Sequence, residues 1–175
     1  IEVCLVGSEM CIRDRLHSDA PEAIYAHQPG LKVVMPATPY DAKGLLIASI
    51  RDPDPVIFFE PKRIYRAFRE PVPNEAYTLP IGKARVVTEG TDLTVVAWGA
   101  MVVEAAKAAE KSNASIELID LRTISPLDED TILASVEKTG RCVVCQEAPL
   151  TLGLASEISS PVSYTHLRAH ETHLN

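Results

Sequence analysis

Several common signals of function are missing from this sequence of 175 residues. No apolar run approaches the roughly 20 residues that a membrane-spanning helix needs, and no segment has the pattern of a Sec-type signal. The glycine motif GxGxxG and the P-loop are also absent, so the sequence indicates neither nicotinamide dinucleotide nor nucleoside triphosphate binding. From these absences we expect a soluble, intracellular protein with no membrane partner.

Positive charge is in short supply. Lys and Arg number 17 against 24 Asp and Glu, which gives a net charge of -7. An acidic protein repels the phosphate backbone of nucleic acids, so this balance argues against a nonspecific nucleic-acid binder. A local basic cluster is present, and we interpret it as a solvated face: it comprises Lys62, Arg63, Arg66 and Arg69.

The four cysteines form neither a metal motif nor a redox motif. Cys142 and Cys145 fall on a strand predicted over residues 141–146, and positions three apart on a strand point to opposite faces. Such a pair is poorly placed to hold one metal ion or to form a disulfide. We expect reduced thiols that pack as small apolar side chains.

What the sequence does contain is a regular alternation of helix and strand signals. Residues 17–66 predict a short helix over 19–27 and then two strands, over 31–35 and 56–59, that flank a longer helix. The strand runs are almost continuously apolar, as is typical of strands covered on both faces. Strands that follow one another through helices pair in parallel, so the predicted fold class is α/β.

Capping residues mark where the longer helices begin. Thr38 can cap a helix that runs to about residue 50, with Pro39 at its first position and Asp41 where a carboxylate can return a hydrogen bond. Residues 125–128 read Ser-Pro-Leu-Asp and repeat this arrangement. They predict Ser125 as the cap of another helix that runs to about residue 138.

The second half of the chain continues the alternation after a Pro-rich polar segment. This segment, residues 67–80, has neither the helix nor the strand period, and we interpret it as an interdomain linker. Beyond it the signals predict a helix over 101–111 and strands near 83–87, 93–98, 115–119 and 141–146.

A resemblance to a known family rests on six stretches: HSDAPEA, PGLKVVMPATPYDAKGLL, IRDPDPVIFFEPKRIYR, IDLRTISPLDEDTI, KTGR and EAPLTLGLASEIS. They cover roughly residues 16–160, and with them the chain resembles the β subunit of the thiamine-diphosphate-dependent 2-oxoacid dehydrogenase E1 component. The resemblance implies an α/β fold with the C-terminal part of a transketolase-like pyrimidine-binding domain over residues 16–66. After the linker, it implies an incomplete transketolase C-terminal-type α/β domain over residues 81–160.

The stretches FFEPKRIYR, VAWG and EAPLTLG are more similar to the branched-chain enzyme than to the pyruvate enzyme. The resemblance therefore implies oxidative decarboxylation of a branched-chain 2-oxoacid on thiamine diphosphate, with acyl transfer to lipoyl on E2. The alternatives are a pyruvate dehydrogenase E1 β subunit, another transketolase-like enzyme, or a non-catalytic fragment for subunit assembly. The implied partners are the E1 α subunit, in an α2β2 heterotetramer, and the lipoyl and subunit-binding domains of E2. The implied location is the bacterial cytoplasm, or the mitochondrial matrix for a eukaryotic source.

The resemblance also implies site residues. His17 matches the family's active-site histidine, and an imidazole that titrates near neutrality can exchange protons during acylation of lipoyl. A purely structural role at a helix start is the alternative for this residue. The main-chain carbonyls of Ser49, Ile50, Asp52 and Asp54 match a potassium-binding turn, for which the alternative is a proline-stopped helix end without an ion.

Parts of the family's cofactor site are expected elsewhere. Magnesium and the diphosphate of the cofactor are assigned to the α subunit, because this chain has no Gly-Asp-Gly motif and magnesium needs hard oxygen ligands. The family's pyrimidine-binding glutamate belongs to a portion that precedes residue 16, so this chain alone is expected to be inactive. Residues 1–15 and 161–175 resemble translated sequencing-adapter read-through, and we expect them not to be native.

One loop departs from the family pattern. Near Glu147, the family usually has two glycines and an aromatic residue where this chain has Leu152, Gly153 and Leu154. Leucine tolerates a positive φ poorly. The sequence therefore does not predict the conformation of this loop.

Overall fold

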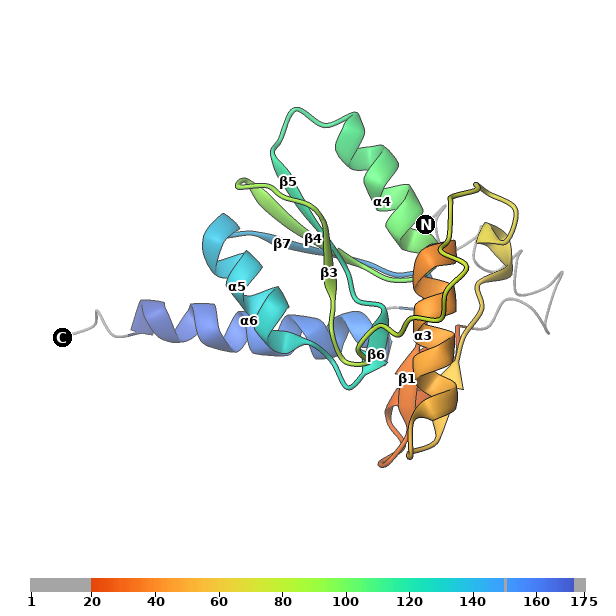
Figure 1. The fold of residues 1–175 in the computed structure, drawn as a ribbon. Helices are drawn as coiled ribbons and strands as arrows, with labels where there is room; N and C mark the ends of the chain where they lie inside the picture. Colours follow the sequence, from red (N-terminus) through yellow and green to blue (C-terminus); the bar gives the residue numbers. More distant parts are fainter. Residues whose placement is uncertain (1–19, 150, 172–175) are drawn as a thin grey trace, which may run out of the picture.

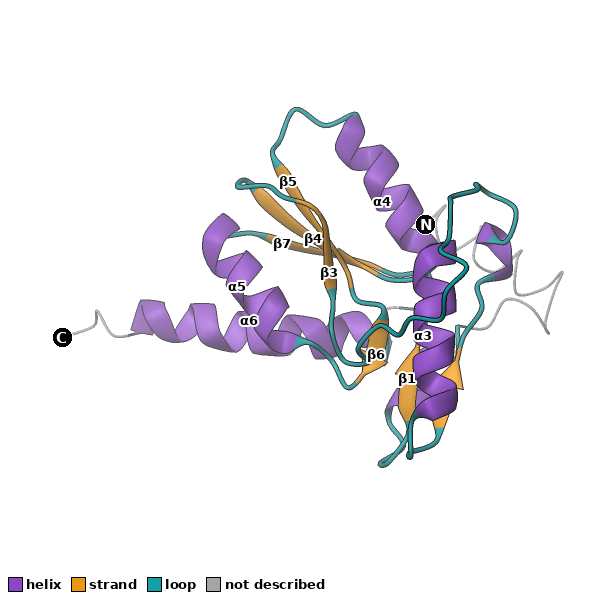
Figure 2. Ribbon diagram, in the orientation of Figure 1, coloured by secondary structure: helices purple, strands orange, loops and turns teal. Residues whose placement is uncertain are grey.

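The computed structural model of the chain describes residues 20–149 and 151–171. Within these residues the chain forms two β-sheets with helices packed against them (Figures 1 and 2). The smaller sheet has three strands in the order β2-β1-β6, and the larger has four in the order β3-β5-β4-β7. The predicted α/β fold class is confirmed.

The smaller sheet is built from both halves of the chain. The short helix α2 (Glu22–Ala26) leads into β1 (Lys32–Val34), which pairs in parallel with β2 (Val56–Phe58). Helix α3 (Pro39–Arg51), drawn in orange in Figure 1, connects these two strands. The third strand, β6 (Thr123–Ser125), comes from far along the chain and pairs with β1 in the antiparallel direction.

The larger sheet belongs entirely to the second half. Its central strands, β4 (Leu93–Ala97) and β5 (Ile116–Asp120), pair in parallel. At one edge β7 (Cys142–Cys145) lies parallel to β4, and at the other edge β3 (Arg85–Thr88) lies antiparallel to β5. The strands predicted from the second half are thus all present, with bounds within about two residues of those expected.

Helices cover both faces of the larger sheet (Figure 2). Helix α4 (Ala100–Glu110) packs on one face, and α5 (Glu129–Thr139) and α6 (Leu154–Glu171) pack on the other. Successive residues of β4 divide between two buried clusters, Val95 on the α4 side and Val96 on the α5 and α6 side, because strand side chains alternate between faces. The cluster that holds Val96 also includes Val33 of β1, so the core continues from one sheet to the other.

The predicted start of α3 is confirmed, whereas that of α5 is wrong. Thr38 caps α3, since its hydroxyl oxygen accepts a hydrogen bond from the Asp41 N–H at 3.1 Å. Ser125 lies in β6 instead, where it pairs with Val33, and α5 begins after Asp128. A serine followed by proline suits either a helix start or a strand end, and the long-range pairing with β1 decides between them.

Residues 67–80 contain no helix or strand and lie along α3. The Leu79 N–H donates to the Gly44 carbonyl at 3.2 Å. The Tyr77 hydroxyl donates to the Tyr40 carbonyl at 2.8 Å, and the two tyrosine rings stack with their centroids 4.6 Å apart. The segment is therefore anchored to the first half of the chain over much of its length.

Helix α6 continues past residue 160, where the sequence analysis ends the second domain, as far as Glu171. Leu154 and Ile158 are buried in its first turns, and Val162 packs against the same core. The domain boundaries and the non-native character expected of residues 1–15 and 161–175 remain predictions. Among the described residues, no helix is long and apolar enough to span a bilayer.

Candidate functional site

The carboxyl ends of four strands, two from each sheet, border one hollow of about 550 Å³. Met35, Phe59 and Trp98 each follow directly after the last residue of a strand, and Glu147 follows β7. In parallel α/β folds, ligands bind outside the carboxyl ends of the strands. We call this space the carboxyl-end hollow. Its lining comprises Ala20, Pro21, Glu22, Met35, Phe59, Glu60, Pro61, Lys62, Arg63, Trp98, Met101 and Glu147.

Glu22 is the one buried charged residue in this lining. It is 3% exposed, and its Oε1 atom accepts a hydrogen bond from the indole N–H of Trp98 at 3.4 Å. A buried carboxylate needs such a partner to offset its loss of water. Because Glu22 begins α2 and Trp98 follows β4, this bond joins the two halves of the chain within the wall of the hollow.

Arg63 links the hollow to the second half of the chain. Its guanidinium donates to Glu104 and to Glu147, in both cases at 3.1 Å. The lining holds three carboxylates against two cations, and Arg63 is already paired. This balance does not fit the binding of a diphosphate. Among the residues that the structure describes, no group of three or more His, Cys, Asp or Glu side chains is arranged to hold a metal ion.

His17 lies outside the described residues, so the structure does not place its imidazole. Ala20, three positions later in the sequence, lines the carboxyl-end hollow. The next two residues, Pro21 and Glu22, line it as well. The catalytic assignment of His17 therefore remains a prediction.

The candidate potassium turn lies where α3 ends. Ser49 and Ile50 belong to its last turn, and the Ser49 carbonyl accepts the Asp52 N–H at 3.4 Å. The Lys32 ammonium contacts the Asp52 carboxylate at 2.7 Å and the Asp54 carboxylate at 3.0 Å. This hydrogen-bonded pairing raises the pKa of Lys32 and lowers the pKa of Asp52.

The chemistry of this turn fits a weakly hydrated monovalent cation. Two carboxylates face one ammonium, and carbonyls at a helix end carry partial negative charge. The turn precedes β2, however, whereas the carboxyl-end hollow follows β2. An ion held by Ser49, Ile50, Asp52 and Asp54 would thus lie at the opposite end of the strand from the candidate site, in a structural position.

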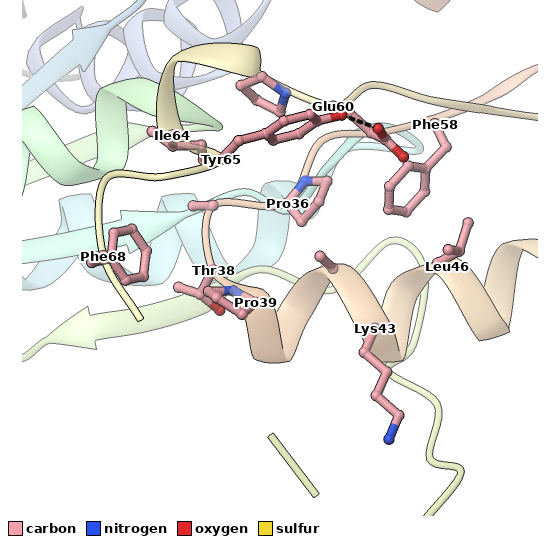
Figure 3. A pocket seen from close by; sticks show the side chains of 13 residues that line it. Pro36, Thr38, Pro39, Lys43, Leu46, Phe58, Glu60, Ile64, Tyr65 and Phe68 are labelled. Carbon is pink, nitrogen blue, oxygen red and sulfur yellow. Dashed lines mark hydrogen bonds between the residues drawn. The ribbon is translucent and has the colours of Figure 1, made fainter. Parts of the chain in front are cut away.

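A second hollow, of about 350 Å³, lies between α3 and the segment that follows β2 (Figure 3). Its lining is mostly apolar, with Phe58 and Phe68 on opposite sides in Figure 3. The Tyr65 hydroxyl donates to the Glu60 carboxylate, which raises the pKa of Tyr65. The side chain of Lys43 points away from the hollow, and its ammonium donates to the Asn74 carbonyl at 3.2 Å. The two charged side chains of the lining, Lys43 and Glu60, thus both have hydrogen-bond partners within the protein, as is typical of a surface formed by packing.

The loop after β7 is organised by Gln146. Its side-chain amide donates to the Ala148 and Pro149 carbonyls at 3.2 and 3.0 Å, and its oxygen accepts the Ala155 N–H at 2.9 Å. Leu152, in the same loop, has a φ of 57° and is 89% exposed. The departure from the family's glycines therefore falls where the backbone adopts a left-handed conformation.

Cys142 and Cys145 are free thiols on β7. Burial raises the pKa of both thiols. A raised pKa keeps the reactive thiolate scarce, which is the behaviour of structural cysteines.

Sequence reasoning did not identify Glu22, Trp98 and Arg63 as neighbours in one site. It places residue 22 only within the short helix predicted over 19–27, and it interprets Arg63 as part of a solvated face. A signal was available at Trp98, the one tryptophan of the chain, because it follows directly after a buried strand and its indole N–H requires a partner when buried.

Two family models match the chain. The transketolase pyrimidine-binding domain matches residues 16–67, and the transketolase C-terminal domain matches residues 82–173. The segment between the two matches corresponds to the irregular stretch that lies along α3.

Curated relatives are similar over most of the chain. It is 57% identical over 159 residues to the pyruvate dehydrogenase E1 component subunit beta of Acholeplasma laidlawii, and 56% identical over 151 residues to that of Bacillus subtilis. The alignments cover 87% and 85% of this chain but 49% and 46% of the relatives, so the chain spans about half of their length. A solved split-gene transketolase, described as an inactive beta4 tetramer, shares the fold. Its TM-score is 0.65 at 23% identity, over 82% of this chain and 47% of that chain.

Proposed function

Because the chain belongs to the transketolase family, as matches to its pyrimidine-binding and C-terminal domains show, we propose that it is part of the β subunit of a pyruvate dehydrogenase E1 component. The two relatives of that name, at 57% and 56% identity, support the pyruvate alternative. The branched-chain reading preferred from FFEPKRIYR, VAWG and EAPLTLG is not supported by them. The proposed reaction is oxidative decarboxylation of pyruvate with acetyl transfer to lipoyl.

The observation that carries this proposal is the position of the carboxyl-end hollow. It gathers the ends of strands from both matched domains, and its wall begins at Ala20, directly after the HSD stretch. Ligand sites of parallel α/β folds lie at this end of the sheet. An apolar wall that includes Met35, Phe59 and Trp98, with a few polar groups between, suits an organic substrate.

The cofactor is proposed to be shared between subunits. Thiamine diphosphate supplies the chemistry of decarboxylation when it is bound, but the acidic balance of the hollow does not suit its diphosphate group. The charge of the hollow thus supports placement of the diphosphate, with its magnesium, on an E1 α subunit, within an α2β2 heterotetramer that serves the lipoyl and subunit-binding domains of E2. A structural potassium ion at the end of α3 and a bacterial cytoplasmic location complete the proposal.

His17 is the proposed proton-transfer group. The support is its position in the sequence, three residues before Ala20, which lines the hollow. An imidazole there can hold or release a proton near neutral pH while lipoyl is acylated.

We expect His17→Ala to slow lipoyl acylation about 10²- to 10⁴-fold, which is the usual cost of removing one proton-transfer group. The assay uses an intact subunit, with the native upstream sequence restored and paired with its α subunit, and a lipoyl domain as acceptor. The thermal midpoint should stay close to that of the wild type.

His27→Ala is the matched control, because His27 is exposed at the end of α2 and does not line the hollow. This variant should keep full acylation. If His17→Ala also acylates lipoyl at the wild-type rate but melts earlier, the histidine is structural and the catalytic proposal must be withdrawn. A wild-type reconstituted enzyme that fails to turn over pyruvate would instead refute the proposed function.

A further inference from the structure

Four charged groups, two buried carboxyls and two partly buried arginines, meet where the two halves of the chain join. Asp41, in the first turn of α3, accepts a hydrogen bond from the Arg122 guanidinium at 2.5 Å and lies 3.5 Å from Arg85 Nη1. Arg85 Nη2, in turn, lies 3.6 Å from Asp120 Oδ2, at the end of β5. Asp41 belongs to the first half and the other three residues to the second, so the cluster spans the joint.

The two carboxyl groups of the cluster are deeply buried, and the cluster is incompletely hydrogen-bonded. Asp41 and Asp120 are both fully inaccessible to solvent. Asp120 Oδ1 accepts the Arg122 N–H at 3.1 Å, but Asp120 Oδ2 has no hydrogen-bond partner, and neither has the Nε of Arg85 or of Arg122. A buried carboxylate oxygen without a donor makes the ionised form of that carboxyl costly.

Asp120 accordingly holds its proton more tightly than an aspartate in water. Burial, with a smaller contribution from the nearby Asp41 charge, raises the pKa of Asp120 from 3.8 to about 7, although Arg85 and Arg122 oppose the change. Asp41 faces it from α3, Arg85 from β3, and Arg122 from the turn before β6. The cluster therefore changes its charge near neutral pH.

We propose that Asp120 is the proton-binding element of a joint between the two halves, and that opening of the joint is coupled to loss of this proton. Opening lets water reach the carboxyl and returns it to its ordinary acidity. Between pH 4 and pH 7 the closed joint holds a proton that the open joint has released, so the closed form is favoured at low pH. As pH rises, opening becomes easier by up to about tenfold per pH unit and levels off above pH 7.

Hydrogen exchange at one amide reports on the joint directly. The Met35 N–H of the first half donates to the Arg122 carbonyl of the second half at 2.9 Å. The Thr94 N–H donates to the Arg141 carbonyl at 2.9 Å, a bond within the second half. After correction for intrinsic exchange, the protection factor of Met35 should fall about 50-fold between pH 5 and pH 7 and about twofold more by pH 8, while that of Thr94 changes much less because the second half keeps its structure.

Two variants test the assignment. Asp120→Asn keeps the shape of the protonated side chain, so Met35 in this variant should keep its high protection from pH 5 to pH 8. His27→Gln changes an exposed side chain outside the cluster, and it should keep the wild-type step. A step that survives in Asp120→Asn, or that disappears in His27→Gln, would overturn the proposal. So would an equal fall at Thr94, because the proton would then be linked to unfolding of the whole chain.

A direct titration needs no variant. The side-chain carboxyl carbon of Asp120 can be followed by NMR in the wild-type chain labelled with 13C-aspartate. A midpoint near pH 7 supports the proposal even if Asp120→Asn fails to fold. A midpoint near pH 4 would show that the buried carboxyl is ionised throughout and would refute it.

Discussion

Leu152 is a residue at which the side chain and the backbone conformation are poorly matched. Its φ of 57° lies in the left-handed region, where a side chain of L configuration costs about 1–2 kcal/mol. The side chain is 89% exposed, so little packing compensates for this cost. The resemblance to a family that usually has glycines in this loop also indicates, from the sequence alone, that leucine is unfavourable here.

Leu152→Gly should therefore raise the free energy of unfolding by about 0.5–1 kcal/mol. The gain is smaller than the relieved strain because glycine also adds conformational freedom to the unfolded chain. Urea unfolding followed by the fluorescence of Trp98 measures the change.

Leu46→Gly provides the matched control at a partly exposed leucine inside α3. It should lower the free energy of unfolding by about 1 kcal/mol, the usual cost of glycine in a helix. If Leu152→Gly destabilises the chain by a similar amount, the positive φ of Leu152 carries no strain.

Helices and strands were predicted well wherever their signals are local. The signal for the start of α3 lies within four consecutive residues, and the structure confirms the predicted threonine cap. The start of α5 uses similar letters and was predicted wrongly, because Ser125 is drawn into β6 by pairing with Val33, a residue far away in the sequence. Capping rules consider only neighbouring residues, so they cannot predict that a residue pairs with a distant strand.

Gly44 marks the closest approach between α3 and the segment that lies along it. A Cβ atom at this position would be 2.7 Å from side-chain carbons of both Leu79 and Tyr77. Alanine inside a helix normally gains about 1 kcal/mol over glycine, whereas overpacking costs about 1–3 kcal/mol. We expect Gly44→Ala to lower the free energy of unfolding by about 1 kcal/mol, as measured by urea titration.

The double variant Gly44→Ala with Leu79→Ala isolates the clash. Removing the Leu79 side chain should make Gly44→Ala less costly than it is in the wild-type background, so the two changes should not add. Strictly additive effects would mean that residues 67–80 do not pack against α3 at this point.

For the whole molecule, the shared three-stranded sheet predicts that the two halves differ in autonomy. Residues 20–81 alone would lose β6 from the sheet and would separate Val33 from its core cluster. We expect this piece to be unfolded by far-UV circular dichroism, because two short strands rarely form a stable sheet. Residues 82–171, with all four strands of the larger sheet, should retain structure.

The intact chain should unfold in one transition. Circular dichroism and the fluorescence of Trp98, which contacts Glu22 of the other half, should give the same midpoint. Cooperative folding of residues 20–81 alone, or two separate midpoints in the intact chain, would show that the halves are independent.

The sites that sequence reasoning could not assemble are all formed across this joint. Asp41 and Asp120 each look like an ordinary helix-start or strand-end carboxylate, and only the fold brings them to the same pair of arginines. The same holds for Glu22 and Trp98. The strands and α3 follow from local pattern, whereas these contacts depend on how the two sheets are placed.

The pairing of β6 with β1 also determines when, during translation, the smaller sheet can be completed. Val34 pairs with Thr123, so β1 gains its second neighbour only after roughly 90 further residues are made, which takes about 5–20 s at usual rates of translation. Throughout that interval β1 presents an unpaired edge, which is a template for a strand from another chain. The yield of correctly paired protein should therefore depend on keeping nascent chains apart on the ribosome.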